Sequence, residues 1–320
     1  MMRIPDIYFT SFWGELNCQL ENGVYEKFEY ENGKGKGFYH FIKKPVPIKI
    51  NDIQYYDTIT PYGFNGPIII ECQEDRKKFI EEFNTEFNKF CVEHRIVAEY
   101  VRFNPWLKNH EDFKEIYNLR YNNYTLGVDL TGDFFYDQFT SKCRNQVRKA
   151  IKSNVNIEYD FKGGSIGEFY RLYNLMVEKN KVGENYRFSK DYFINTFEKC
   201  KDKVFILNAI YENKVISSAM FLQYEDFIHY HFSGNDAEFG SLCANNLLLF
   251  TAATWGKENG KKTLHLGGAF SESLFRFKQS FTKNGIFDYY VGTKIRNKEV
   301  YDELVNQKKD INLNFFPAYR

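Results

Sequence analysis

The sequence predicts an α/β protein of two domains, each with a mixed central sheet. Its 320 residues exceed the size, roughly 250–300 residues, at which a single hydrophobic core usually stops growing. Both halves also repeat one order of elements: a β-hairpin, a turn, an amphipathic helix and a strand. Hydrophobic residues make up 43% of the chain, so each half has enough apolar surface for a core of its own.

The first half contains one copy of this unit. A β-rich run over 37–59 leads to a turn at 60–67 that Pro and Gly punctuate heavily. A helix is predicted from about 75 to 93, because apolar residues recur there at i, i+3 and i+4 on one face. A strand over 96–103 then closes the unit.

Between the two copies, the sequence predicts a strand over 125–130 and a basic helix that starts near Asp137. No Pro- or Ser-rich linker marks the boundary. We therefore place it near Leu130, which gives an N-terminal domain over 1–130 and a C-terminal domain over 131–320.

The second half repeats the unit. Strands over 204–211 and 215–224 flank the hairpin turn Glu212-Asn213-Lys214. A strand over 227–232 follows, and a helix over 244–258 ends at Asn259-Gly260. A last strand is predicted over 263–266.

The charge balance excludes a strong global electrostatic field. Forty-three Lys and Arg oppose 42 Asp and Glu, which leaves a net charge of +1. Any contact with nucleic acid must then come from local basic clusters, and DNA is not an expected partner. The six cysteines form no C-x-x-C pair and no zinc spacing, so we expect reduced thiols and no bound metal.

The N-terminus lacks an apolar signal segment, and no stretch reaches the ~18 apolar residues of a membrane span. The sequence therefore predicts a cytoplasmic protein. If its product or acceptor is membrane-bound, we expect only a peripheral membrane contact.

The predicted basic helix carries five cations and no acid between Ser141 and Lys152. Arg144, Arg148 and Lys152 fall at i, i+4 and i+8, so they form one stripe in which like charges repel. Such repulsion indicates an anionic ligand, and the guanidinium fork suits phosphate. The alternative is a solvated helix face whose charge is balanced by acids elsewhere.

A glycine pair and a lysine form the second candidate group. Gly267-Gly268 at a strand end permits a ligand to approach the backbone closely, or makes a tight turn. Lys278 is a cation in a segment dominated by Phe275, Phe277 and Phe281, so it either extends to solvent or points into a polar cavity. In a cavity it can stabilise the oxyanion of an acyl-transfer intermediate or the charge on a leaving group.

Two further groups carry open alternatives. His229 and His231 fall on one face of a predicted strand, where they act as a base toward an amine or are core histidines satisfied by their neighbours. Asn245 and Asn246 follow the loop 239–244 at the start of a helix. Free N–H groups there suit phosphate, but any helix start also needs a cap.

Taken together, these segments resemble the Fem family, the peptidoglycan-bridge aminoacyl transferases, within the wider fold of the GCN5-related acetyltransferases (GNAT). The segments that carry the resemblance keep the family's order: 144–150, 244–248 with 255–260, and Gly267-Gly268 with Phe275-Arg276-Phe277-Lys278. The similarity covers roughly residues 100–285. It extends loosely to the first hundred residues through 12–15 and the turn at 60–67.

The resemblance implies two tandem GNAT-like domains and no tightly bound cofactor. It further implies an aminoacyl-tRNA donor and, as acceptor, an amine on a phosphate-bearing cell-wall, lipid-linked or nucleotide-sugar precursor. Lys278 would lie near the scissile ester with Phe277 beside it, and Arg144 toward the acceptor phosphates, across a cleft that Lys278 and Arg144 share. The predicted substrate- and phosphate-binding residues are Arg144, Arg148, Asn145, Tyr62, Gly267, Gly268, Asn245, Asn246, His229, His231 and Arg276.

Three departures from the family pattern bear on function. No long helical hairpin is inserted, as in the shorter family members without a coiled-coil arm. Glu15-Leu16-Asn17 stands where relatives often carry a Lys, which leaves the acceptor open. The loop 239–244 lacks the Gln/Arg-x-x-Gly-x-Gly/Ala pattern that grips the pyrophosphate of coenzyme A, so a coenzyme A donor is disfavoured.

Two other functions stay open on the sequence. One is an acyl-CoA-dependent N-acyltransferase acting on an amino sugar or small metabolite in surface-polysaccharide synthesis. The other is a non-catalytic GNAT-like protein that binds a nucleotide-sugar or RNA. The transferred group and the oligomeric state are not predicted.

Overall fold

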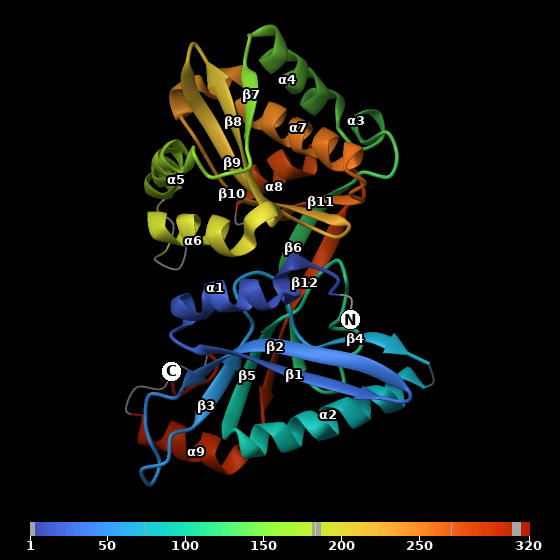
Figure 1. The fold of residues 1–320 in the computed structure, drawn as a ribbon, viewed down its shortest axis with the longest axis vertical. Helices are drawn as coiled ribbons and strands as arrows, with labels where there is room; N and C mark the ends of the chain where they lie inside the picture. The colour runs from blue at the N-terminus through green and yellow to red at the C-terminus, as the bar shows by residue number, and fades with distance from the viewer. Residues whose placement is uncertain (1–3, 74, 181–182, 184–186, 270, 309–314) are drawn as a thin grey trace. The chain divides into compact units, whose positions relative to one another are not determined.

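The computed structural model describes residues 4–73, 75–180, 183, 187–269, 271–308 and 315–320 (Figure 1). The chain forms two compact units. Unit 1 contains Ile4 and residues 8–123 and 288–320, and unit 2 contains residues 5–7 and 124–287. The predicted division at Leu130 differs from these units, because residues 288–320 return to unit 1 instead of staying with the second domain.

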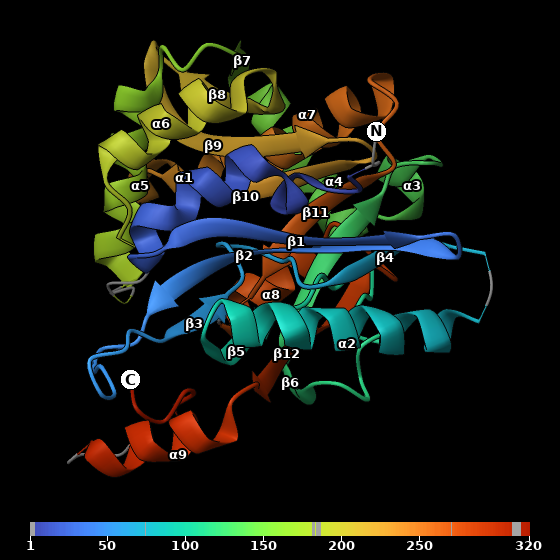
Figure 2. The same ribbon diagram turned by 60° about the horizontal axis from the view of Figure 1, so that its bottom comes forward.

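Unit 1 has a mixed sheet in the order β1-β2-β3-β5-β12, with β4 paired to β2. Among its described strand pairs, β3 and β5 run parallel and the others run antiparallel. The long helix α2 lies along this sheet (Figure 2) and buries a stripe of phenylalanines against it. The elements of unit 1 are η1 (Ile7–Phe9), α1 (Ser11–Glu21), β1 (Val24–Asn32), β2 (Gly35–Pro45), β3 (Tyr56–Ile59), β4 (Ile68–Cys72), α2 (Arg76–Glu93), β5 (Ile96–Arg102), β12 (Ile286–Ile295) and α9 (Lys298–Gln307).

The strands of unit 2 lie in the order β6-β11-β10-β9-β8-β7. β10 and β11 run parallel, and the other pairs are antiparallel. Its elements are β6 (Asn118–Asp129, which begins in unit 1), α3 (Phe134–Asp137), α4 (Ser141–Lys152), β7 (Asn156–Asp160), α5 (Ile166–Asn180), α6 (Lys190–Cys200), η3 (Lys201–Lys203), β8 (Val204–Tyr211), β9 (Lys214–Tyr224), β10 (Phe227–Asn235), η4 (Ala237–Leu242), α7 (Ala244–Glu258), β11 (Thr263–Gly268) and α8 (Glu272–Gln279).

Helices cover both faces of the unit 2 sheet. α4 and α7 pack together over a core that contains Phe205, Leu207 and Ala209 of β8. α5 and α6 pack on the other face of the strands, as Figure 1 shows. α5 approaches β10 so closely at Gly234 that a Cβ atom there would lie 2.2 Å from the backbone of Leu172. Gly234 thus sets the spacing between helix and sheet.

Several predicted elements are confirmed with their local causes. α2 begins after Asp75, whose carboxylate caps the N–H groups of Lys77 and Lys78. The β8–β9 hairpin turns at Glu212 and Asn213, both at positive φ, as a type I′ turn requires. α7 has the predicted bounds. By contrast, the basic helix begins at Ser141 and not near Asp137, because Thr140 caps it.

Within the described residues, the helices between β10 and β12 are short: α7 has 15 residues and α8 has eight. No coiled-coil arm is inserted in this part of the described chain. Among the described helices, none combines the length and the apolar run needed to cross a bilayer.

Candidate functional site

The central feature of unit 2 is the point where β10 and β11 part. They pair only over 227–229 and 263–265. Past His229 and His265, each strand has an irregularity in its pairing with its outer neighbour. β10 continues along β9 and β11 continues along β6, so backbone edges at the centre of the sheet no longer pair with each other. Bulges at such points commonly mark functional sites.

Lys278 lies at this divergence. Its Nζ donates a hydrogen bond to the carbonyl of Gly268 at 2.6 Å and lies 5.9 Å from the ring centroid of Tyr230. The residue is 7% exposed, and among the described residues no carboxylate forms an ion pair with it. Burial lowers the pKa of the Lys278 ammonium to about 7, because the charged form loses its hydration.

Gly267 shapes the space around this ammonium. Its φ is +76°, and a Cβ atom at this position would lie 3.4 Å from Lys278 Nζ. The left-handed backbone disfavours any other residue here. The glycine pair therefore both aims the Gly268 carbonyl at Lys278 and keeps the adjacent space open.

Helix α8 carries Lys278 inward and its other polar residues outward. Ser271 caps its start by accepting from the N–H of Leu274. Arg276 points to the surface and forms an i,i+4 ion pair with Glu272. Phe277 is half-buried, and its ring packs edge-on against Phe281 at 5.2 Å between centroids.

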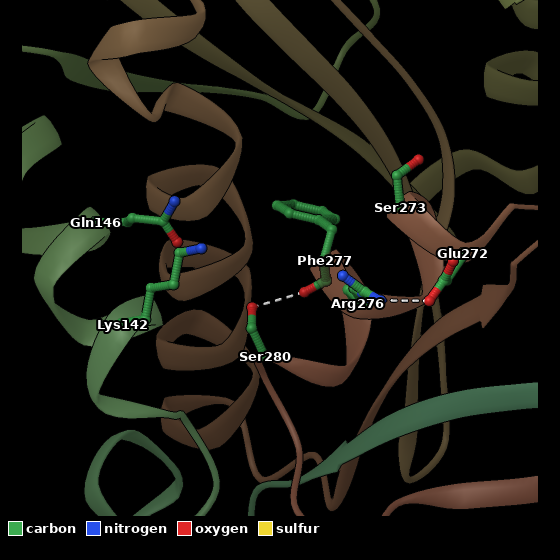
Figure 3. Close-up of a pocket in the computed structure, with 7 residues that line it drawn as sticks. All are labelled: Lys142, Gln146, Glu272, Ser273, Arg276, Phe277 and Ser280. Atoms are coloured by element: carbon green, nitrogen blue, oxygen red, sulfur yellow. Dashed lines mark hydrogen bonds and ion pairs between the residues drawn. The ribbon is translucent and has the colours of Figure 1, made fainter.

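A pocket of about 420 Å³ lies between α4 and α8. Figure 3 shows Lys142 and Gln146 on one wall, and Phe277 with Arg276 on the other. The lining residues are Lys142, Gln146, Glu272, Ser273, Arg276, Phe277 and Ser280. The pocket thus presents two cations and one carboxylate, a lining suited to an anionic or zwitterionic group.

This pocket includes two of the predicted site residues, Phe277 and Arg276, but its lining contains neither Lys278 nor Arg144. Arg144 instead donates to the carbonyl of Phe139 at 2.5 Å and lies over the ring of Tyr136. The shared cleft between Lys278 and Arg144 therefore remains a prediction, and Lys142 is the α4 cation at this pocket.

Arg148 and Asn145 lie on the exposed side of α4. Arg148 donates to Asn145 Oδ1 at 3.2 Å and lies over the ring of Phe135. The predicted stripe of cations is thus engaged with its own helix and with the aromatic residues of α3. Its expected role in phosphate binding remains a prediction.

The two asparagines at the start of α7 connect elements of unit 2. Asn246 is buried, and its amide donates to Gln146 Oε1 at 3.3 Å, so it holds a pocket residue in place. Asn245 accepts from the Ser217 hydroxyl and donates to Asn235. Both side chains therefore contact protein groups that fix α7 against α4 and the sheet.

The predicted histidines occupy different surroundings. His229 is fully buried, with Nε2 3.0 Å from Asp6 Oδ2 and Nδ1 3.4 Å from His265 Nδ1. His231 packs edge-on against Phe232, and burial lowers its pKa to about 3. The pairing of β10 with β9 is irregular between residues 230 and 232, and the shared face of the two rings remains a prediction.

Tyr62 belongs to unit 1. Its carbonyl accepts a hydrogen bond from Trp13 Nε1 at 2.7 Å, which ties the turn at 60–67 to α1. This contact explains why the turn is ordered. The predicted substrate role of Tyr62 stays a prediction.

The pocket residues that the sequence did not identify are Lys142, Gln146, Glu272, Ser273 and Ser280. Two signals were present in the sequence: Lys142 and Gln146 are one helical turn apart, as are Glu272 and Arg276. Nothing in the sequence, however, brings two helices from 130 residues apart to one pocket. Asp6 carried no signal at all.

Residues 141–279 match the family profile described as "Acetyltransferase (GNAT) domain". No curated protein sequence matches the chain. Among solved structures, FemX is similar with a TM-score of 0.69 and 14% identity, over 93% of this chain and 94% of that one. The C-terminal domain of a protein assigned as a lysylphosphatidylglycerol synthetase, from Agrobacterium fabrum, is similar with a TM-score of 0.56 and 13% identity, over 90% and 88%.

A third similar structure is a tandem GNAT protein from the clavulanic acid biosynthesis pathway, with a TM-score of 0.51 and 6% identity over 86% and 83%. These findings support one class of protein, an acyltransferase that carries a GNAT domain over residues 141–279. Over 93% of its length, the chain has a fold similar to that of FemX.

Proposed function

We propose that the protein transfers an aminoacyl group from a charged tRNA to an amine of a phosphate-bearing cell-wall or nucleotide-sugar precursor, in the cytoplasm. The single observation that carries this proposal is Lys278, a buried amine with no described carboxylate partner, at the point where β10 and β11 part. An aminoacyl ester is already activated. Its transfer needs positioning and stabilisation of the developing charge, and no covalent enzyme intermediate.

In this proposal, unit 2 holds the reacting ester. Lys278 acts on the ester group, and Gly267 and Gly268 shape the channel for the donor end. Phe277 presents an apolar face to the pocket between α4 and α8. The phosphate of the acceptor binds cations of α4, for which Lys142 at the pocket is a candidate beside the predicted Arg144 and Arg148.

The loop before α7 supports a tRNA donor over acyl-CoA. In a coenzyme A site, this helix start would hold a pyrophosphate. Here α7 begins at Ala244 after Cys243, which makes no side-chain cap, and the loop 239–244 keeps one glycine and has no Arg or Gln. The loop therefore lacks the side chains that would grip a pyrophosphate.

The second candidate is an acyl-CoA-dependent N-acyltransferase acting on an amino sugar or small metabolite. The matched profile supports it, since its description is that of an acetyltransferase domain. The two candidates share the fold and the acyl chemistry, and they differ in the donor.

The donor can be tested directly. The purified protein is given either a mixture of charged tRNAs or acetyl-CoA, each with a set of amine acceptors, and amide formation is measured. Loss of product on treatment with ribonuclease supports the tRNA donor. Release of free thiol from acetyl-CoA together with acylated product supports the second candidate and overturns the first.

Lys278→Ala tests the residue that carries the proposal. Removing one stabilising group of this kind commonly lowers turnover by about 10²–10³. The effect on turnover should far exceed the effect on folding, since the substitution removes one hydrogen bond, to the Gly268 carbonyl, and no salt bridge among the described residues. Unchanged turnover would remove Lys278 from the mechanism.

A further inference from the structure

A buried chain of three titratable side chains lies in unit 2 beside Lys278. Asp6 Oδ2 is 3.0 Å from His229 Nε2, and His229 Nδ1 is 3.4 Å from His265 Nδ1. All three residues are at most 2% exposed. The acyl-transfer step described above uses none of them, although buried polar groups of this kind are costly unless they have partners.

The contacts limit which nitrogen atoms of this chain can carry protons. The two Nδ1 atoms face each other, so they share one proton. When Asp6, as the carboxylate, accepts the Nε2 proton of a neutral His229, His229 Nδ1 becomes an acceptor. The proton between the rings then belongs to His265 Nδ1, which leaves His265 Nε2 as a hydrogen-bond acceptor.

Asp6, His229 and His265 form a hydrogen-bonded relay and not a metal site. The ring nitrogens contact one another in sequence, and within the described residues no group of three or more His, Cys, Asp or Glu is arranged to hold a metal ion. Burial lowers the pKa of His265, and the protonated forms of His229, Lys278 and His231 would lower it further. His265 is therefore a neutral imidazole that senses the charge on Lys278.

The surroundings of Lys278 offer acceptors but no counter-charge. β11 contributes the Gly268 carbonyl and the neutral His265, and β10 contributes the ring of Tyr230, whose hydroxyl donates to Ser233. On its own helix, Glu272 and Arg276 are exposed and pair with each other. Among the described residues, the ammonium form is thus held by neutral groups, and burial favours the free amine.

We propose that Lys278 carries the proton of the acyl-transfer step, and that Asp6, His229 and His265 are positioning residues that hold a neutral acceptor nitrogen near its ammonium form. This inference rests on the proposed acyl transfer. It goes beyond it by assigning Lys278 a proton-transfer role and by assigning a function to Asp6 and the two histidines.

The step balances without another reactant. The neutral amine of Lys278 takes the proton that the attacking nitrogen loses as its bond to the ester carbonyl carbon forms. The resulting ammonium then gives this proton to the ester oxygen as the carbon–oxygen bond breaks. Lysine ends as the neutral amine, and its positive charge exists only while the tetrahedral intermediate is negative, which stabilises the transition state more than the ground state.

The decisive experiment is rescue of Lys278→Ala with added small primary amines, measured as amide formation over a range of pH. If Lys278 carries a proton, the rescued rate follows the concentration of the neutral amine and rises with pH. If Lys278 acts only as a fixed cation, the rescued rate follows the concentration of the alkylammonium and falls with pH, and the inference is overturned.

Lys278→Arg gives the second test, because a guanidinium cannot give up its proton near neutral pH. The inference expects the rate of Lys278→Arg to fall at least as far as that of Lys278→Ala. A rate near that of wild type overturns the inference.

The relay is tested by Asp6→Asn, with His40→Gln as the control, a buried histidine of unit 1. Loss of the Asp6 carboxylate removes a negative charge, and it also removes the acceptor that keeps the His229 proton on Nε2. Both effects destabilise the ammonium of Lys278. The midpoint of the pH–kcat/KM profile should therefore move down by up to about one pH unit. If Asp6 had a purely structural role, Asp6→Asn would lower the thermal midpoint and leave the midpoint of the pH–kcat/KM profile in place. This is the result expected for His40→Gln. The same result for Asp6→Asn overturns the positioning role.

These outcomes separate the two levels of the proposal. If wild-type protein forms no amide from either donor, the proposed function fails. If wild type is active and the amine rescue or the Asp6→Asn profile gives the opposite result, only the proton-transfer inference fails. The acceptor amine also titrates. A fall of kcat/KM at low pH that persists in Lys278→Ala rescued by added amine belongs to the acceptor, and it is subtracted before the midpoints of the pH profiles are compared.

Discussion

The burial of Lys278 makes stability depend on pH in a way that one substitution should remove. Burial lowers the pKa of its ammonium from 10.5 to about 7 in the native protein, whereas the unfolded chain titrates near ~10.4. Between these values the unfolded chain binds a proton that the native chain does not. The free energy of unfolding therefore rises with pH across this window, and below about pH 7 the penalty is constant. Lys278→Met keeps a side chain of similar shape and removes the titrating group.

The size of the effect follows from the two pKa values. A fall from 10.5 to about 7 corresponds to about 5 kcal/mol, since one pKa unit is about 1.4 kcal/mol. Near pH 7 this is the full cost of the buried amine. From pH 7 to pH 9, the stability of wild type relative to Lys278→Met should increase by about 2 kcal/mol.

The measurement is urea unfolding of both proteins at several pH values from 6 to 9, followed by tryptophan fluorescence. Comparison with Lys278→Met cancels the titration of all other groups. Lys149→Met, which removes an exposed ammonium of α4, is the matched control and should run parallel to wild type. Parallel curves for wild type and Lys278→Met would refute the reasoning, because they would mean that the amine titrates alike in the folded and unfolded chains.

Three further predictions concern the pocket, unit 1 and the helix packing. Lys142→Ala should raise the KM for a phosphate-bearing acceptor by about tenfold with kcat nearly unchanged, and Arg144→Ala should also act mainly on KM. Steady-state kinetics with the same acceptor decide which of the two cations binds its phosphate. An unchanged KM in either variant shows that its residue does not bind the phosphate. Glu99→Gln should destabilise the protein by about 3–5 kcal/mol in urea unfolding, because it leaves the buried guanidinium of Arg296 without its counter-charge; a loss below about 1 kcal/mol would contradict this. Gly234→Ala should cost about 3 kcal/mol, because its Cβ atom would strike the backbone of Leu172, whereas Gly240→Ala, where nothing lies within 4 Å, should have little effect on the thermal midpoint.

Local pattern was sufficient to predict most elements of unit 2. The hairpin at Glu212-Asn213 and the bounds of α7 each depend on residues that are close in sequence. For Lys278 the sequence left two positions open, because the phenylalanines around it leave the ammonium either a cavity or the surface. The structure gives it the buried position.

Contacts between distant segments could not be predicted in this way. β12 pairs with β5 across 189 to 197 positions, which returns residues 288–320 to unit 1. Asp6 reaches His229 across 223 positions, and no local pattern marks either partner. α4 shows the boundary between the two situations. Its buried Cys143, Val147 and Ala150 are a readable apolar stripe, yet only α8 decides that Lys142, and not Arg144, lines the pocket.

The absence of a described carboxylate beside Lys278 is the feature that connects stability to chemistry. A carboxylate there would offset the cost of burying the ammonium and would raise its pKa. The amine would then stay protonated near neutral pH and could no longer accept the proton of an attacking nitrogen. The parting of β10 and β11 makes this arrangement possible, because the Gly268 carbonyl and the open space at Gly267 lie where a paired sheet would leave no room. The same burial that lowers stability therefore supplies the neutral amine, and a variant that gained stability at this position would lose the proton carrier.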